Sequence, residues 1–148
     1  GLDGEDRAWM ARRGIPSVPP SDVLRPATEE ELLRAAQRDG VSVAAHSWSH
    51  PNLTQLDDAG LREELFRPRE WLAARVAETL PVLAYPYGLS DPRVRAEAGR
   101  AGYRAAFRVD GGWIPGRGAE PHALPRLGVA AGLSLDGFRL RLAGWLAR

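Results

Sequence analysis

The chain contains no cysteine, which excludes disulfide bonds and thiolate metal sites. It also has no lysine, so all 20 basic residues are arginine. These arginines are interleaved with acidic residues and leave a net charge of +1, without the basic patch that is typical of nucleic-acid binding. No apolar run reaches the roughly 18 residues of a membrane-spanning helix. The sequence therefore predicts neither a nucleic-acid partner nor a membrane span in this chain.

The length and the hydrophobic content are sufficient for one domain with a core. The chain has 148 residues, of which 44% are hydrophobic. Residues 1–27 are polar and rich in proline, so we interpret them as a linker or loop and place the domain at 28–148. Because the chain opens at Gly1 without a clear strand, we expect the beginning of the domain to lie upstream.

Helix and strand signals alternate along residues 28–148. Thr28 with Glu31 forms a capping-box pattern at the start of a helix that runs to about residue 38. Further helices are expected at 59–78, where Pro68 predicts a kink or a split, at 92–102, and after Ser134. The expected strands are 41–45, 82–85, 103–109 and 124–129. This alternation predicts an α/β fold with a parallel sheet and with its chemistry at the C-terminal ends of the strands.

Two histidines directly follow the first expected strand. His46 and His50 are four residues apart, a spacing that places both imidazoles on one side of a helical turn, where they can share a metal ion. Neutral imidazole suits zinc and similar divalent ions. The alternative interpretation is a pair of surface loop histidines, and the spacing alone does not separate the two.

A second group of candidate residues follows the strand expected at 82–85. Pro86, Tyr87 and Gly88 are typical of a tight turn with an aromatic side chain beside it. Such a turn can direct a backbone N–H into a cleft, as an oxyanion hole requires. The alternative is an ordinary strand-to-loop turn.

The later part of the chain supplies three weaker candidates. His122 is a candidate general acid, with a solvated loop histidine as the alternative. Arg126 follows Pro125 and is a candidate partner for a carboxylate. Trp113 is a candidate for stacking on a sugar ring or for closing the edge of the core, and the sequence leaves both open.

The order of these motifs resembles the polysaccharide deacetylase family, also called the NodB-homology domain or carbohydrate esterase family four. The segment His46-Ser-Trp-Ser-His50-Pro-Asn-Leu is similar to the family's His-Thr-x-x-His-Pro-x-Leu motif, and residues 84–88 are similar to its Pro-Tyr-Gly motif. Gly102-Tyr103 and Leu124-Pro125-Arg126 also match the later part of such domains. The resemblance covers residues 28–148.

The resemblance implies an enzyme that hydrolyses acetyl groups, most often N-acetyl groups, on a polysaccharide or oligosaccharide with the help of a divalent metal, usually zinc. His46 and His50 would be metal ligands, and the Tyr87 backbone N–H would stabilise the oxyanion. Arg126 would position a catalytic carboxylate, His122 is the candidate acid, and Pro86, Tyr87 and Trp113 would contact substrate. A bacterial protein of the cell envelope or the extracellular space is implied by the resemblance only.

One family motif has no counterpart in this chain. The Thr-Phe-Asp-Asp-Gly strand, which supplies the general base and the third metal ligand, should lie before Gly1. We therefore expect a partial, distorted (β/α) barrel that lacks its first strand or strands, and a fragment that is inactive without its upstream segment. The alternative is a non-catalytic glycan-binding relative that has lost these acidic residues. A weaker one is a hydrolase of the same broad fold that acts on a small amide.

Overall fold

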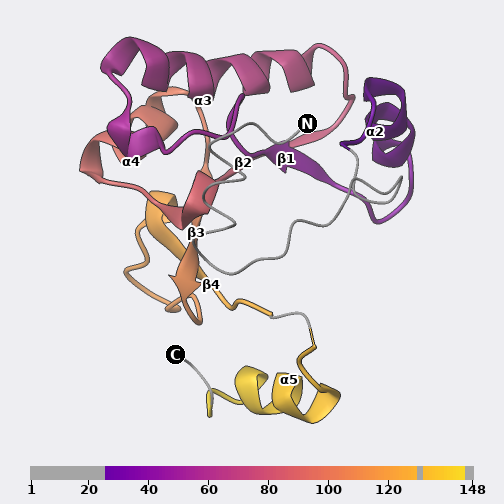
Figure 1. Ribbon diagram of the computed structural model, residues 1–148, viewed down its shortest axis with the longest axis vertical. Coiled ribbons are helices and arrows are strands. Elements are labelled where there is room, and N and C mark those ends of the chain that lie inside the picture. The colour runs from indigo at the N-terminus through magenta and orange to yellow at the C-terminus, as the bar shows by residue number, and fades with distance from the viewer. Residues whose placement is uncertain (1–25, 130–131, 146–148) are drawn as a thin grey trace, which may run out of the picture. The chain divides into compact units, whose positions relative to one another are not determined.

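The computed structural model describes residues 26–129 and 132–145 (Figure 1). Most of the expected linker at 1–27 lies outside these residues. The chain divides into two compact units, residues 1–41 and 42–148.

The described part of the first unit contains one helix, α2 (Glu29–Ala36). The predicted capping box is present: the Glu31 N–H donates to Thr28 Oγ1 at 3.2 Å, and the Thr28 N–H donates to Glu31 Oε2 at 2.8 Å. The expected start of this helix is confirmed, because a cap depends only on neighbouring residues.

The second unit is built on a parallel sheet, as predicted. Its four described strands have the order β1-β2-β3-β4 and all pair in parallel (Figure 1). The strands are β1 (Val43–Ala45), β2 (Thr79–Ala84), β3 (Ala105–Gly111) and β4 (Leu124–Arg126). Among the described residues this sheet does not close into a barrel. The α/β fold class is confirmed.

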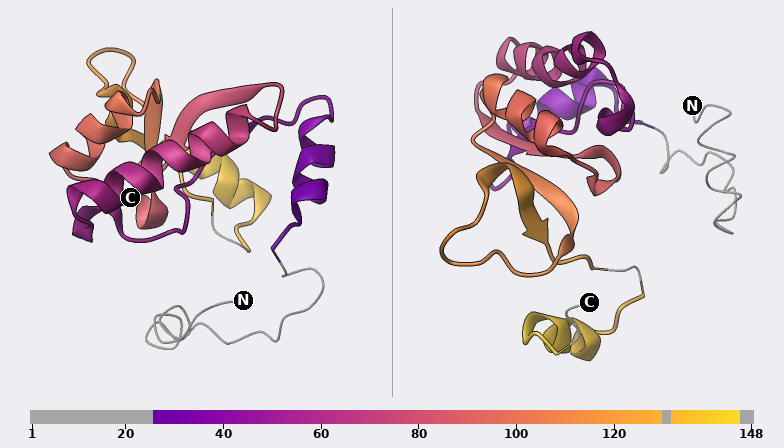
Figure 2. Two further views of the ribbon diagram at one scale, coloured as in Figure 1. Left: turned by 90° about the horizontal axis from the view of Figure 1, so that it is seen from above. Right: turned by 90° about the vertical axis from the view of Figure 1, so that its left-hand side faces the viewer.

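Two helices cover one face of the sheet (Figures 1 and 2). Helix α3 (Asp58–Ala73) contacts β1 and β2, and α4 (Pro92–Arg100) contacts β3 and α3. Asp57 and Asp91 cap the two helices, with side-chain oxygens that accept backbone N–H groups at 2.8 Å in both cases. In the described residues no helix is both long and apolar enough to cross a lipid bilayer.

Helix α3 differs from the expectation in two ways. It ends at Ala73, not at Glu78, because residues 74–78 form the turn that leads into strand β2, which pairs with β1 from Thr79 onward. It also continues through Pro68 without being split. Proline removes one hydrogen bond of the helix, but Pro68 is buried, which offsets part of the loss.

Strand β3 begins two residues later than expected because α4 ends in a Schellman motif. Gly102 adopts φ 84°, and the Tyr103 N–H donates to the Ala98 carbonyl at 3.1 Å. Tyr103 therefore turns into the core, where its hydroxyl donates to the Leu65 carbonyl at 2.9 Å. This bond ties the end of α4 to the middle of α3.

The core lies between the two helices and the sheet. Its fully buried side chains come from both layers and from the loops that join them: Leu53, Leu61, Leu65, Leu83, Tyr85 and Val94. Burial of such side chains removes apolar surface from water and is the main stabilising term of the fold.

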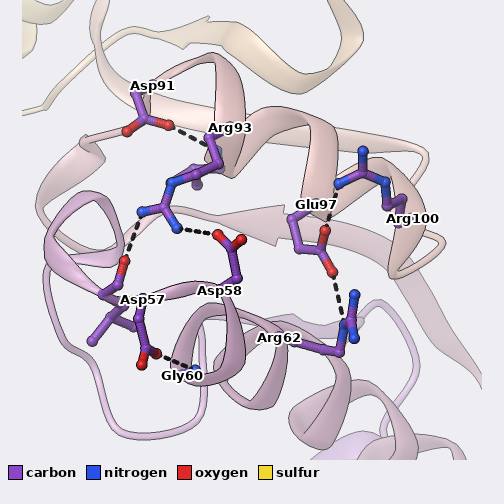
Figure 3. A network of polar contacts seen from close by, with 10 residues as sticks. Asp57, Asp58, Gly60, Arg62, Asp91, Arg93, Glu97 and Arg100 are labelled. Carbon is purple, nitrogen blue, oxygen red and sulfur yellow. Dashed lines mark hydrogen bonds and ion pairs between the residues drawn. The ribbon is translucent and has the colours of Figure 1, made fainter.

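Polar contacts add a second link between α3 and α4 (Figure 3). Arg93 donates to Asp58 at 2.9 Å and to the Leu56 carbonyl at 2.7 Å. Glu97 accepts from Arg62 of α3 at 3.2 Å and from Arg100 of its own helix at 2.7 Å. These bonds link the two helices to each other.

The last helix, α5 (Leu135–Leu142), begins at the predicted cap, where the Gly137 N–H donates to Ser134 Oγ at 3.0 Å. Leu135 and Leu142 in this helix are 63% and 41% exposed, and Trp145, just beyond its end, is 82% exposed. The expected helix is present, but its large apolar residues are not buried among the described residues.

Candidate functional site

His46 immediately follows the C-terminal end of β1. Its Nδ1 lies 2.7 Å from the carbonyl oxygen of Ala84, the last residue of the neighbouring strand β2. Because a carbonyl only accepts, Nδ1 carries the proton in this hydrogen bond, and the lone pair of the neutral ring is then on Nε2. A backbone carbonyl on one imidazole nitrogen is the usual support for a histidine that binds metal through the other.

The structure brings His50 and Tyr87 to His46. The two imidazole centroids are 4.8 Å apart, and the His50 and Tyr87 ring centroids are also 4.8 Å apart, both in edge-to-face arrangements. The three rings come from two loops that follow neighbouring strands. They define the candidate site, which is at the end of the sheet where a parallel fold places its chemistry.

The path between the two histidines is not the predicted helical turn. Ser47 and His50 have φ values of 64° and 63°, in the left-handed region, so residues 46–50 form an irregular loop. Ser47 Oγ accepts the His50 N–H at 3.0 Å and closes this loop. The two imidazoles are close, as expected, but not for the expected reason. Their spacing predicted that they lie on one side of a helical turn, whereas residues 46–50 form no helix.

The loop after β2 places Tyr87 through its neighbours. Pro86 is buried and Tyr87 is 38% exposed, with φ 57°. Gly88 has φ 70°, and a Cβ at this position would lie 2.5 Å from the backbone nitrogen of Val109 in β3. Only glycine fits so close to a neighbouring backbone, so Gly88 lets the turn pack against β3 and fixes Tyr87 beside His50.

Sequence reasoning missed Glu64. This residue is on the core-facing side of α3, yet it is charged, and only 8% of its surface is exposed. Its carboxylate accepts the backbone N–H groups of Trp48 at 2.8 Å and Ser49 at 2.9 Å, and the hydroxyl of Ser49. A glutamate in register with the apolar residues of the helix was the signal that could have identified it.

An open hollow of about 330 Å³ lies beside His46. Trp48 and Trp71 contribute aromatic surface to its lining, and Pro68 and Leu72 of α3 contribute aliphatic surface. Arg67 lies over the Trp48 ring, 4.0 Å from its centroid. The hollow thus offers a mainly apolar wall next to one imidazole.

The structure does not bring His122 to this site. Its Nε2 lies 2.8 Å from the Tyr103 carbonyl, just before the N-terminal end of β3, and its ring faces Gly99 of α4. Its own carbonyl accepts the Tyr85 hydroxyl at 2.8 Å. These contacts are those of a structural histidine, and the proposed acid role stays a prediction without support from them.

Arg126 and Trp113 lie beyond the central strands. The Arg126 Nε donates to the Arg108 carbonyl at 2.6 Å, which fixes this side chain along β3. Trp113 is 55% exposed in the loop after β3. The described residues give neither of them a contact with His46, His50 or Tyr87.

The described residues fit a metal ion in part. Two imidazoles converge, and His46 has the tautomer that a ligand needs, but the described part of the chain has no group of three or more histidine or acidic side chains placed so that they could hold a metal ion. A zinc site in proteins normally has at least three protein ligands. The pair is therefore suitable as part of a site that a further ligand completes.

Comparison with known proteins identifies the family. The family model for polysaccharide deacetylase matches residues 20–106. Over 76 residues the chain is 36% identical to chitin deacetylase 1 of Cryptococcus neoformans, which is 49% of this chain and 15% of that protein. The chain belongs to the polysaccharide deacetylase family.

Solved structures show the same fold. A deacetylase from Streptococcus pyogenes in complex with acetate superposes with a TM-score of 0.60 at 19% identity, over 65% of this chain and 42% of that one. A polysaccharide deacetylase from Bacillus cereus gives a TM-score of 0.61 at 22% identity, over 68% of this chain and 32% of that one. The chain thus spans less than half the length of each of these relatives.

Proposed function

We propose that this chain is part of a larger metal-dependent deacetylase that hydrolyses acetyl groups, most often N-acetyl groups, on a polysaccharide. The observation that carries the proposal is the pair of imidazoles in the loop after β1, with His46 Nδ1 bonded to the Ala84 carbonyl at the end of the neighbouring strand β2. The chitin deacetylase relative supports an N-acetylated sugar as substrate. A location at the cell envelope or outside the cell is part of the same proposal.

His46 and His50 would hold the divalent ion, with zinc as the expected metal. A bound ion of this kind polarises an acetyl carbonyl and lowers the pKa of a bound water. The Tyr87 backbone N–H is the proposed oxyanion donor, because Tyr87 is at the turn that faces His50. The rings of Tyr87 and His50 form one wall that limits where a sugar can lie.

The chain alone lacks part of this machinery among its described residues. The general base and the third ligand would be carboxylates from a segment upstream of Gly1. We propose Arg126 as the residue that positions the catalytic carboxylate, His122 as the candidate acid, and Pro86 and Trp113 as substrate contacts. These four assignments depend on the resemblance, and Pro86, which is buried, would act by shaping the turn.

The test is hydrolysis of an acetylated chito-oligosaccharide by two proteins: this chain, and the same chain extended by the sequence that its gene encodes before Gly1. We expect no turnover from the first and chelator-sensitive turnover from the second. Metal-dependent turnover by the 148 residues alone would contradict the expectation that they are incomplete.

Exposed aromatic residues favour one alternative, a glycan-binding relative without activity. Trp48 and Tyr87 are each 38% exposed near the histidines. Glycan binding that is unaffected by chelation, together with an inactive extended protein, would favour this alternative over the hydrolase.

A further inference from the structure

The loop that carries the two histidines has a backbone that needs support. Ser47 and His50 both adopt φ values in the left-handed region, at 64° and 63°. Residues other than glycine rarely adopt this conformation, and they retain it only where the surrounding structure holds them there. The position of the His50 ring relative to His46 depends on this conformation, since Ser47 and His50 themselves supply the two unusual dihedral angles.

One side chain from a different element supplies the support. Glu64 Oε2 accepts the N–H groups of Trp48 and Ser49, the two residues between the left-handed positions, at 2.8 and 2.9 Å. Its other oxygen accepts the Ser49 hydroxyl. Consecutive N–H groups that converge on one carboxylate form a compact anion-binding arrangement, and charge-assisted bonds of this kind are stronger than neutral ones.

Glu64 is itself held rigidly. It is in the middle of α3, its surface is 8% exposed, and the adjacent Leu65 is fully buried. A buried carboxylate is costly unless its oxygens are hydrogen-bonded, and the loop satisfies both oxygens. One turn further along α3, Arg67 covers the ring of Trp48. Helix and loop therefore fix each other.

We propose that Glu64 is a positioning residue of the metal site: its carboxylate holds residues 47–49 in the conformation that sets the His46 and His50 imidazoles side by side. This inference rests on the proposed function, because it takes the two histidines to be metal ligands. Glu64 touches neither imidazole in the contacts found, so it acts through the backbone of the loop.

The positioning role needs a side chain as long as glutamate with an oxygen that accepts the loop N–H groups, and it depends less on the negative charge. In Glu64→Gln the amide oxygen still accepts the two N–H groups, and the amide nitrogen donates to the Ser49 hydroxyl. Glu64→Asp keeps the charge but is one methylene too short for the loop. Glu64→Ala removes the contact entirely. Glu70→Ala, an exposed glutamate of the same helix, is the matched control.

The experiment is titration of each variant of this chain with Zn²⁺ by calorimetry, and with Co²⁺ by its visible absorption, at a temperature where circular dichroism shows the protein folded. Loss of an outer support typically lowers metal affinity about 10- to 100-fold. We expect this loss for Ala and Asp, with Gln and Glu70→Ala within a few-fold of the parent. Hydrogen exchange of the Trp48 and Ser49 amides should accelerate in the same two variants.

Each outcome has a distinct meaning. Unchanged affinity in folded Asp and Ala variants, or a Gln variant as weak as Ala, overturns the positioning role while the metal site stands. If Ala does not fold, the comparison of Asp with Gln decides in its place. A parent chain that binds neither ion, with or without its upstream segment, overturns the proposed function and this inference with it.

Discussion

Gly88 is the residue at which a single added methyl group should disturb both the fold and the site. In Gly88→Ala the new Cβ would lie 2.5 Å from the Val109 backbone nitrogen and equally close to two of its side-chain carbons, so no rotation of a flexible side chain relieves the overlap. The residue must also keep φ near 70°. We expect the change to push the turn at 85–89 away from β3 and Tyr87 away from His50.

The magnitude follows from two terms. A left-handed conformation costs a residue with a Cβ about 1–2 kcal/mol. Forced overlap in a packed region adds about 1–3 kcal/mol. We therefore expect Gly88→Ala to lower the free energy of unfolding by about 2–5 kcal/mol, measured by urea denaturation with circular dichroism.

Gly112 provides the matched control. It has φ 76° but no atom within 4 Å of the position of a Cβ, so Gly112→Ala carries the first term alone. The difference between the two variants isolates the contact with β3. A Gly88→Ala protein that loses no more stability than Gly112→Ala would show that contact with β3 does not constrain the turn at 85–89.

Three further predictions concern groups of the core. Hydrogen bonds with Arg100 and Arg62 lower the pKa of Glu97, so its stabilising effect is present above its ordinary pKa of 4.5 and is lost as pH falls below it. In Glu97→Gln the free energy of unfolding should fall less steeply with pH in acid, by about 1 kcal/mol at most, and an unchanged dependence on pH would contradict this. Burial raises the pKa of Tyr103 from 10.0 to about 12, so its contribution to stability is present below pH 10 and is lost as pH rises toward 12. Tyr103→Phe should cost about 1–2 kcal/mol at neutral pH, and its melting temperature should fall less with pH above 10 than that of the parent. His122→Ala should lower stability by about 1–3 kcal/mol and leave zinc affinity unchanged, because Nε2 bonds the Tyr103 carbonyl away from the two histidines. Loss of zinc binding in a folded His122→Ala protein would show that His122 contributes to the metal site.

Features that depend on neighbouring residues could be predicted from the sequence. The helix starts at Thr28, Asp91 and Ser134 are where expected, because a cap needs only a side chain and the N–H groups two or three residues ahead. The parallel α/β arrangement followed from the alternation of helix and strand signals. The two motifs at strand ends followed from their residues and from the family resemblance.

Features that depend on distant residues could not be predicted. Thr79 onward pairs with β1 instead of continuing a helix, which no local pattern indicates. Glu64 accepts the N–H groups of Ser49 and Trp48, which are 15 and 16 residues away, and His122 bonds the distant Tyr103 carbonyl. The described residues contain no group of three or more histidine or acidic side chains that could hold a metal ion, so the fold does not identify a third ligand for the proposed site.

We propose that His46 and His50 together bind a divalent metal. The most direct test is calorimetric titration with Zn²⁺ at neutral pH of this chain, of the chain extended upstream, and of His46→Ala in both, with His122→Ala as the control histidine. We expect one weak site that tightens markedly in the extended protein and disappears with His46→Ala alone. No binding in either parent protein, or binding that survives loss of His46, would contradict the proposal.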